Sequence, residues 1–525
     1  MVRSFTKLDN YFFVAGLFLL LAFAAYFSVL HGGFVLDDEH FIQKNEHVRT
    51  FDLKSIYTNS VTQGANKVSN FYRPNQQAAF ALMYRFFKEN PVPYHVLSVG
   101  IHCINAFLIY IFFSFIFFER NYSFMASLLF LVHPVQTEAV AFISGLSDPL
   151  GVFFLLLSLL FFYRFLQNAG GTGSDNVLLS EKPDTGRPGV WEPHNRRRFI
   201  NWSYVFYIFF ALQAILCKES MVMVLPLSAL VLLRERKNKQ WKSLIPVVVI
   251  VSVYTVLKFV YFSQTGTLGL TTQTNLYTEH LWVRLCTFVN IVPEYLRLFF
   301  YPAQLNYEKP YVAYVTLFSF RAFIGTAVVI LFLSGVLSYR KHPVPALLCA
   351  WVLFTMSPFT GIIALNSMYL EHWLYLSMPA LCMLAVYIVF SLFEKKKHKY
   401  LYICFSLLMF WAVFLTSARA AQWADTEKFY LNEMKYAEDS VRVCNNLGMF
   451  YAEHNDLDLA QKYYIKAIAE GLASPEPYYN LSSIYLAQGR VKEAAALLEK
   501  SLEIKPDFYY SMQRLKKLRN MEKNM

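Results

Sequence analysis

The sequence predicts an all-α protein, in which a polytopic helical membrane domain is followed by a short helical solenoid. The first observation is the composition, because 56% of the 525 residues are hydrophobic and the mean hydropathy is +0.34. A soluble protein of this length does not need so much apolar surface. The second observation is the recurrence of apolar runs of about 20 residues, the length that crosses a bilayer. The third is a repeat with a period of 34 residues near the C-terminal end.

Eleven apolar segments have the length and composition of membrane spans. The first segment follows Arg3 and Lys7, as the apolar part of a signal peptide would, but it fills a complete crossing. We therefore expect a retained first helix. The eleven segments cover residues 11–30, 96–118, 122–141, 148–166, 201–217, 219–234, 243–263, 315–338, 344–364, 371–391 and 398–417.

Basic residues in the loops set the expected orientation, because positive charge stays on the cytoplasmic side. If eleven segments cross, all six basic regions are cytoplasmic and the C-terminal repeats lie outside. A crossing by the further apolar piece 285–301 would reverse the later loops. The helix around that piece carries Arg284, Glu294 and Arg297, so we expect an amphipathic helix on the outer surface. The basic regions are residues 3–7, 119–120, 196–198, 234–242, 340–342 and 395–397.

The charge and the cysteines exclude several classes of function. The net charge is +12, but surplus Lys and Arg in a membrane protein mostly set its orientation, so nucleic-acid binding is not indicated. The seven cysteines lie mostly in apolar runs and show no C-x-x-C spacing. This pattern argues against a disulfide framework and against a zinc site.

We expect two domains, a membrane domain over residues 1–418 and a repeat domain over residues 419–525. The membrane domain contains an outer loop at 31–94, a polar cytoplasmic loop at 167–200, and an outer loop with the amphipathic helix at 264–314. The first part of this last loop is rich in Thr, Gly and Gln. It is either a lid over an outer cleft or a plain connector.

The repeat domain resembles tetratricopeptide repeats. Asn446 recurs as Asn480 and Ala460 as Ala494, a half repeat precedes them, and residues 508–522 have the polar character of a capping helix. Arrays of this kind bind peptides on a concave face. The alternative is a rigid packing cap on the membrane domain, because the array is short.

Three consecutive acids, Asp37, Asp38 and Glu39, follow the first apolar segment. Burial in the bilayer would be very costly for them, so we expect them just outside the membrane. They form either a solvated helix terminus or the general base of an active site at the membrane surface. The other ionisable groups also gather at one face, whereas an ion-coupled transporter usually has them near the midplane.

Six short motifs occur in order before the repeats. With them, the chain resembles the bacterial branch of the transmembrane and tetratricopeptide-repeat family of GT-C glycosyltransferases, which are protein O-mannosyltransferase-like. The resemblance covers nearly the whole chain. The motifs are Phe34-Val35-Leu36-Asp37-Asp38, Tyr72-Arg73-Pro74, His133-Pro134-Val135-Gln136-Thr137-Glu138-Ala139-Val140, Ser144-Gly145-Leu146-Ser147-Asp148, Cys217-Lys218-Glu219 and Glu371-His372-Trp373-Leu374-Tyr375-Leu376.

This resemblance implies a GT-C fold and an inverting transfer of a sugar from a polyprenyl-phosphate carrier, usually to Ser or Thr hydroxyls of a protein. It also implies a multi-pass protein of the bacterial inner membrane, with a cytoplasmic N-terminus and periplasmic repeats. Two alternatives stay open. One is a related enzyme that modifies a glycan or a lipid or transfers a whole oligosaccharide, and the other is a non-enzymatic membrane scaffold that presents the repeats.

The chemistry assigns candidate roles to the motif residues. A carboxylate suits deprotonation of the attacking hydroxyl, negative charge favours an oxocarbenium-like transition state, and a cation suits the leaving phosphate. The catalytic candidates are Asp37 and Asp38. Arg73 is the first choice for the phosphate, because its fork fits phosphate oxygens. The donor-binding candidates are Arg73, Lys218, Glu219, Arg297 and His372, although for Arg297 we favour snorkelling to the headgroups. The residues that contact the acceptor or only shape the site are Glu39, Tyr72, His133, Glu138, Asp148, Glu371 and Tyr375.

No metal ligands are assigned. His133 and Glu138 have a spacing that is weak for a metal, so a helix-orienting hydrogen bond is the favoured role for this pair. Asp148 opens an apolar segment, either as its cap or as a contact to substrate. The expected ligands are a lipid-linked sugar donor, a protein acceptor bound through the repeats, and membrane lipids. A requirement for a divalent metal is left open.

Overall fold

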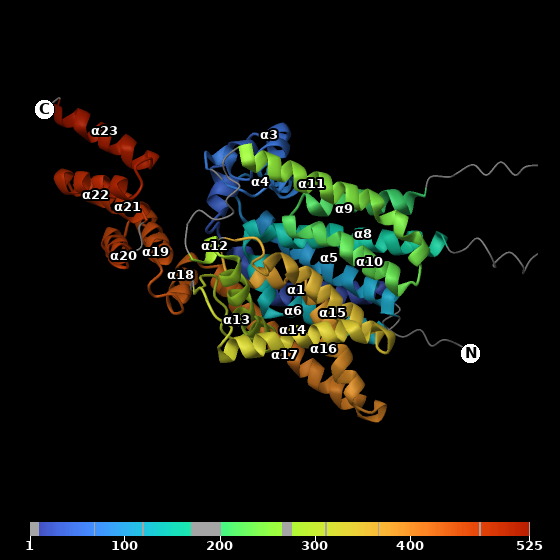
Figure 1. Ribbon diagram of the computed structural model, residues 1–525. Helices are drawn as coiled ribbons and strands as arrows, with labels where there is room; N and C mark the ends of the chain where they lie inside the picture. Colours follow the sequence, from blue (N-terminus) through green and yellow to red (C-terminus); the bar gives the residue numbers. More distant parts are fainter. Residues whose placement is uncertain are drawn as a thin grey trace, which may run out of the picture.

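The chain folds into a helical bundle that carries a smaller helical stack at one end (Figure 1). Within the described residues the chain forms helices and no strand, so the predicted all-α class is confirmed. The computed structural model describes residues 10–67, 69–117, 120–169, 201–264, 276–309, 312–365, 367–471 and 474–523. Most of the predicted cytoplasmic loop at 167–200, and the first part of the predicted lid or connector, lie outside these ranges.

Every predicted span contains an apolar helix of the bundle. The helices are α1 (Tyr11–Tyr26), α5 (Val92–Phe117), α6 (Arg120–Val132) with α7 (Thr137–Ala141), α8 (Ser147–Ala169), α9 (Trp202–Ile215), α10 (Val224–Arg234), α11 (Ile245–Gln264), α14 (Phe320–Leu337), α15 (Pro343–Met356), α16 (Met378–Leu392) and α17 (His398–Trp423). Within the described ranges, six helical segments are long and apolar enough to cross a bilayer, and α6 with α7 makes a seventh if this bent pair is one span. Helices α9, α15 and α16 are apolar but shorter. A multi-pass membrane protein is therefore supported, and the count of eleven crossings stays a prediction.

The third span is broken at His133-Pro134. Proline has no backbone N–H, and it favours an extended residue before it, as seen at His133 with φ −74° and ψ 125°. Helices α6 and α7 consequently meet at 52°. The break turns Glu138, on α7, into the interior, where it is fully buried.

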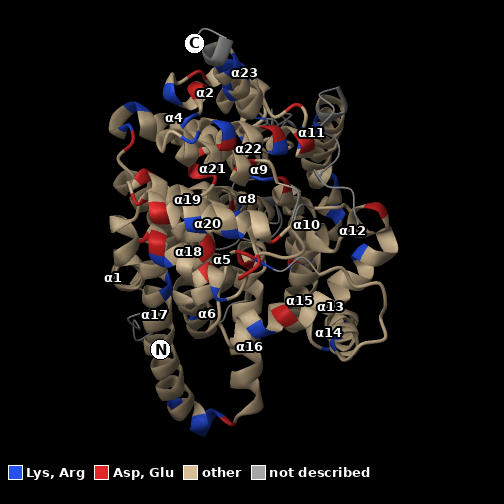
Figure 2. Cartoon of the chain, turned by 90° about the vertical axis from the view of Figure 1, so that its left-hand side faces the viewer, with Lys and Arg blue, Asp and Glu red and all other residues tan. Residues whose placement is uncertain are grey.

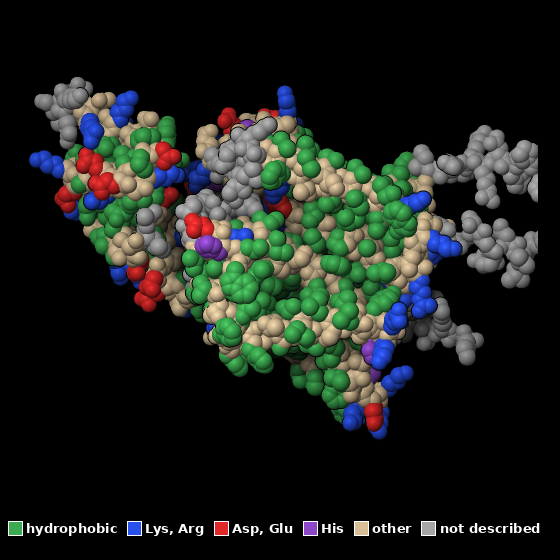
Figure 3. Space-filling model, viewed as in Figure 1, with side chains coloured by type: hydrophobic (Ala, Val, Ile, Leu, Met, Phe, Trp, Pro, Cys, Tyr) green, Lys and Arg blue, Asp and Glu red, His purple; other side chains and the backbone are tan. Residues whose placement is uncertain are grey.

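A broad apolar surface covers the bundle (Figure 3). Helices α11, α14 and α17 expose large side chains that a soluble protein would bury, including Leu257, Phe323 and Phe410. In the same view, Lys and Arg side chains gather at the end of the bundle opposite the C-terminal stack. This distribution supports burial of the bundle in a membrane.

Helix α13 (Leu281–Phe300) contains the predicted amphipathic piece. Its buried residues recur every three or four positions on one side, as at Val283, Cys286, Asn290 and Leu298. Helix α13 packs against α14. The amphipathic pattern is present, and its place on the outer membrane surface stays a prediction.

The outer loop after α1 forms three short helices, α2 (Glu46–Arg49), α3 (Leu53–Thr58) and α4 (Pro74–Phe87). They enclose a second, smaller apolar core, which includes Ile42 and Phe80. This core lies beside the two loop segments that carry the acidic triplet and Arg73.

The C-terminal stack consists of α18 (Thr426–Met434), α19 (Val441–Glu453), α20 (Leu457–Ala469), α21 (Glu476–Ala487), α22 (Val491–Ile504) and α23 (Tyr509–Lys523). The pairs α19–α20 and α21–α22 are the two predicted repeats, with α18 before them and α23 after them. Gly448 leaves room for Tyr464 between the helices of the first pair, because a Cβ atom there would lie 2.6 Å from the Tyr464 ring. Asn480 Nδ2 donates to Asn445 Oδ1 at 2.9 Å and joins the two repeats.

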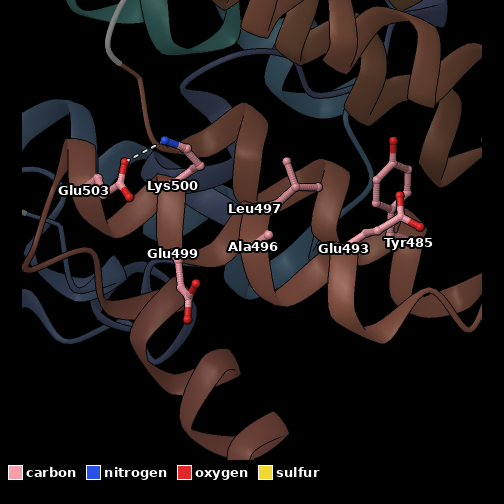
Figure 4. A pocket seen from close by; sticks show the side chains of 7 residues that line it. All are labelled: Tyr485, Glu493, Ala496, Leu497, Glu499, Lys500 and Glu503. Carbon is pink, nitrogen blue, oxygen red and sulfur yellow. Dashed lines mark hydrogen bonds and ion pairs between the residues drawn. The ribbon is translucent and has the colours of Figure 1, made fainter.

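Two hollows mark the surface of the repeats. Figure 4 shows the first, a depression of about 370 Å³ along α22 in which Lys500 pairs with Glu503 at 2.9 Å. The second, of about 520 Å³, lies between α21 and α23 and is lined by Tyr479, Arg514 and other polar residues. Neither hollow contains any of the predicted site residues.

Candidate active site

Asp38 is a buried anchor that ties the outer loop to the bundle. Its carboxylate is fully buried and accepts the N–H of Val35 at 3.0 Å and the N–H of Ser144 at 2.8 Å, together with the Ser144 hydroxyl. Leu36 has φ +54°, a left-handed conformation that is uncommon outside glycine and turns the chain sharply before the acids. Two of the three donors come from Ser144 and join Asp38 to the short helix η6 (Ile143–Leu146), which leads into α8.

Asp37 and Glu39 face other environments. Asp37 is exposed, and its side chain has no hydrogen-bond or ion-pair partner among the described residues. Glu39 pairs with Lys44 at 2.5 Å and lies 3.7 Å from His40, within its own turn of the loop. Of the three acids, Asp37 thus has the carboxylate that is free to accept a proton from a substrate.

Asp38 makes the stability of the protein depend on pH. Burial raises the pKa of Asp38 to about 7, with the hydrogen bonds from Ser144 and Val35 working against this rise. Because the folded state then holds the proton more tightly than the unfolded state, the contribution of Asp38 to the free energy of unfolding is largest below about pH 4 and falls as the pH rises toward 7. We expect Asp38→Asn to remove this dependence of the free energy of unfolding on pH. Unfolding temperatures of the detergent-solubilised chain, measured from pH 5 to pH 8, test this, and an unchanged slope in the variant would contradict it.

Arg73 stands at the start of α4, directly before Pro74. Its Nε donates to Glu219 Oε2 at 3.3 Å, and its Nη1 donates to Ser147 Oγ at 3.3 Å. The guanidinium lies 4.6 Å from the centre of the Phe71 ring. Glu219 also pairs with Lys258 of α11 at 3.0 Å. The Arg73 side chain keeps 13% of its surface exposed, so the guanidinium is held in place without being sealed off.

Lys218 and Asp148 form a buried ion pair. Lys218 Nζ donates to Asp148 Oδ2 at 2.6 Å, and both side chains are about 5% exposed. Asp148 lies in the first turn of α8, where a carboxylate is favoured by the helix dipole. The pair therefore ties the segment after α9 to the same turn that Asp38 and Arg73 contact.

The turn Ser144–Asp148 is thus a common support for three chain segments that are far apart in the sequence. Asp38 binds its first residue, Arg73 binds Ser147, and Lys218 binds its last residue. Four of the six motifs meet here.

The last motif joins the third at His372 and Glu138. His372 Nδ1 lies 2.7 Å from Glu138 Oε1, and the His372 backbone N–H donates to Glu138 Oε2 at 3.1 Å. His372 Nε2 has no hydrogen-bond partner in the described ranges, so it stays available as a donor or an acceptor. Glu371 is buried and pairs with Lys309 at 2.9 Å.

Four other candidates make hydrogen bonds outside the turn Ser144–Asp148. His133 Nδ1 accepts the N–H of Val135 at 3.3 Å, and Nε2 lies 2.9 Å from the Phe299 carbonyl oxygen. The helix-orienting role stays a prediction. The Tyr375 hydroxyl lies in the bundle core, 2.8 Å from His102 Nδ1. The remaining two contacts are Tyr72 OH to the Tyr57 carbonyl at 2.8 Å and Arg297 to Glu294 of its own helix at 2.6 Å.

Several contributors were not singled out from the sequence. Ser144 and Ser147 lie in the fourth of the six motifs, but the sequence gives them no role. Lys258 lies inside an apolar run, and a charge in such a run is a signal of function. Lys309 gives no sequence signal, because its partner Glu371 is 62 residues away. No three His, Cys, Asp or Glu side chains in the described parts of the chain lie close enough to hold a metal ion.

Comparison with known proteins supports the repeats and a likeness over nearly the whole chain. Residues 441–469 and 475–508 match the tetratricopeptide repeat family. The chain is 22% identical over 527 residues to the protein O-mannosyl-transferase TMTC3 of Mus musculus. This match covers 91% of this chain and 54% of that protein. It is 35% identical over 147 residues to the protein O-mannosyl-transferase F38B6.6 of Caenorhabditis elegans, covering 27% of this chain and 21% of that protein. The human protein O-mannosyl-transferase TMTC1 is 35% identical over 169 residues, covering 30% of this chain and 19% of that protein. The chain spans about half the length of the TMTC3 relatives it matches, and over 91% of its own length it is similar to proteins named protein O-mannosyl-transferase.

Proposed function

We propose that this protein is an inverting GT-C glycosyltransferase of the bacterial branch of the transmembrane and tetratricopeptide-repeat family. It moves a sugar from a polyprenyl-phosphate carrier to a Ser or Thr hydroxyl of a protein, on the periplasmic face of the inner membrane. One observation carries the proposal: the turn Ser144–Asp148 binds Asp38, the neighbour of Asp37 in the chain, together with the cations Arg73 and Lys218. The names of the similar proteins support the same class of reaction.

The reaction needs one base and one site for an anion. The acceptor oxygen attacks the anomeric carbon while Asp37 takes the hydroxyl proton. The bond from that carbon to the phosphate oxygen breaks, and its electron pair leaves with the phosphate. A single displacement inverts the anomeric configuration, and the negative charge nearby favours the oxocarbenium character of the transition state.

The cations match the charge of such a donor. Arg73, Lys218 and Lys258 carry three positive charges, which Glu219 and Asp148 reduce to one. A sugar linked to a polyprenyl chain through one phosphate is a phosphodiester with a single negative charge. The surplus positive charge suits this anion, and the planar fork of Arg73 suits two of its oxygens.

We expect Arg73→Ala to raise the KM for the donor by roughly 10- to 100-fold, because a charge-assisted hydrogen bond contributes about 1.5–3 kcal/mol. The measurement is transfer of radiolabelled sugar from polyprenyl phosphate to protein in membranes that contain the chain. Arg85→Ala is the matched control, since Arg85 lies on the same helix and also stacks on a ring, that of Phe51 at 5.2 Å. An unchanged KM in the Arg73 variant would remove Arg73 from the donor site.

The same assay tests the function as a whole. Labelled Ser or Thr residues after protease digestion support a protein acceptor. Label found only in a glycan or a lipid shifts the assignment to the related enzymes. Absence of transfer with every carrier tried contradicts the enzyme assignment and favours a scaffold.

A further inference from the structure

The first repeat helix is bound to the membrane domain through Glu308. The backbone N–H of Glu308 donates to Glu433 of α18 at 2.8 Å. Its carboxylate accepts from the Ser440 hydroxyl at 3.0 Å and from Arg442 Nε at 2.9 Å, with a second bond from Arg442 Nη2. Glu308, in the segment before α14, thus binds both α18, the helix that precedes the repeats, and the start of the first repeat.

The same segment is fixed to the candidate site on its other side. Lys309 Nζ donates to Glu371 at 2.9 Å, and the N–H of Asn306 donates to the same carboxylate oxygen at 2.8 Å. Glu371 directly precedes His372. The segment 305–309 is therefore a short bridge between the repeats and the site.

Two aromatic rings link Arg442 to the turn that binds Asp38. Its guanidinium is 5.2 Å from the centre of the Tyr307 ring. The Tyr307 ring lies 6.0 Å from that of Phe142, two residues before the Ser144 that binds Asp38. Burial raises the pKa of Tyr307, and the charge of Asp37 adds to this rise. Against the effect of burial, Tyr307 and Glu308 raise the pKa of Arg442, and Asp37 adds to this more weakly.

One nitrogen of the Arg442 guanidinium, Nη1, is left over. Its side chain is 54% exposed, and Nη1 has no hydrogen-bond partner among the residues that the structure describes, while Nε and Nη2 bind Glu308. Glu308 already balances the charge of the guanidinium. The N–H groups of Nη1 therefore suit a neutral carbonyl better than a second anion. Figure 2 looks onto the repeats and shows acidic and basic residues of both signs around α18 and α19.

We propose that Arg442 is an acceptor-positioning residue, whose Nη1 donates to a backbone carbonyl of the polypeptide that presents its Ser or Thr hydroxyl to Asp37. This inference rests on the proposed function. An extended peptide offers a carbonyl at every residue, about 3.3 Å apart, so one of them reaches Arg442 while a nearby hydroxyl reaches the base. The repeats then form part of the acceptor site itself.

The test compares Arg442→Ala with Arg490→Ala in the full-length chain. Arg490 is the matched control, because it also binds a glutamate, Glu493, through Nε and Nη2 and stacks on a tyrosine, Tyr485, at 3.7 Å. The readouts are the KM and kcat for a Ser/Thr acceptor peptide, the KM for the donor, and the rate at which water replaces the peptide and hydrolyses the donor. A fourth readout is binding of the fluorescent peptide to the detergent-solubilised chain.

We expect Arg442→Ala to weaken peptide binding and raise the KM for the peptide by about 10-fold or more, with the donor KM and donor hydrolysis unchanged. Arg442→Lys, which keeps a donor, should recover part of the loss, and Arg490→Ala should behave as the native chain.

Equal peptide affinities in the native chain and Arg442→Ala overturn the inference. So does a parallel loss of donor hydrolysis, because Arg442 would then be only structural. Peptide binding without transfer in the native chain would contradict the proposed function alone, whereas no peptide binding at all overturns this inference.

Discussion

Replacing Asp37 with asparagine should lower the rate of sugar transfer by about 10²- to 10⁴-fold, the usual contribution of a general base. Asparagine keeps the shape of the side chain but cannot take the proton of the attacking hydroxyl. The Asp37 side chain is exposed and has no partner in the described part of the chain, so the variant should fold and insert normally. Transfer from a radiolabelled lipid-linked sugar, normalised to inserted protein, measures the effect.

Two comparisons make this result specific to the base. Glu46→Gln removes an exposed carboxylate of the same outer loop and should leave transfer unchanged. Asp38→Asn should mainly lower the amount of folded protein, because an amide has one acceptor oxygen and cannot accept from Val35 and Ser144 at the same time. Full activity in Asp37→Asn would show that the exposed acid is not the base.

The second large effect is expected at the buried pair Lys218–Asp148. Lys218→Met should lower the free energy of unfolding by roughly 3–5 kcal/mol, because it leaves the Asp148 carboxylate buried without its counter-charge. Denaturant or thermal unfolding of the detergent-solubilised chain gives the measurement. A change below about 0.5 kcal/mol, typical of a surface substitution, would contradict the buried ion pair.

A double variant separates the two roles of Lys218. Lys218→Met with Asp148→Leu removes both charges, and replacing a buried pair by apolar residues is often close to neutral. We expect the double variant to regain most of the lost stability. If sugar transfer stays low at restored stability, Lys218 acts on the donor phosphate; if transfer returns, the pair is structural.

The sequence predicts the class and the order of the helices well, because both depend on local signals. Runs of apolar residues mark the bundle, and the recurrence of Asn446 as Asn480 marks the repeats. The break in the third span was not foreseen, although Pro134 was visible, because the segment is apolar on both sides of it. The short helices α9 and α16 also leave the number of crossings open.

The site was predicted as a set of motifs but not as a geometry. The direction of each acid depends on the left-handed backbone at Leu36 and on a partner, Ser144, that is 106 residues beyond Asp38. Arg73 finds Glu219 across 146 residues. Pairings over such distances are decided by how the bundle packs, and a single sequence contains no signal for them.

The shared turn at Ser144–Asp148 has a mechanical consequence. Membrane helices tilt and slide when bilayer thickness changes. Here Asp38, Arg73 and Lys218 all bind residues of one short turn, Ser144–Asp148. A local frame that moves as one body therefore sets the spacing between the proposed base and the cations proposed to bind the phosphate, and this spacing should stay constant in thin and thick bilayers alike.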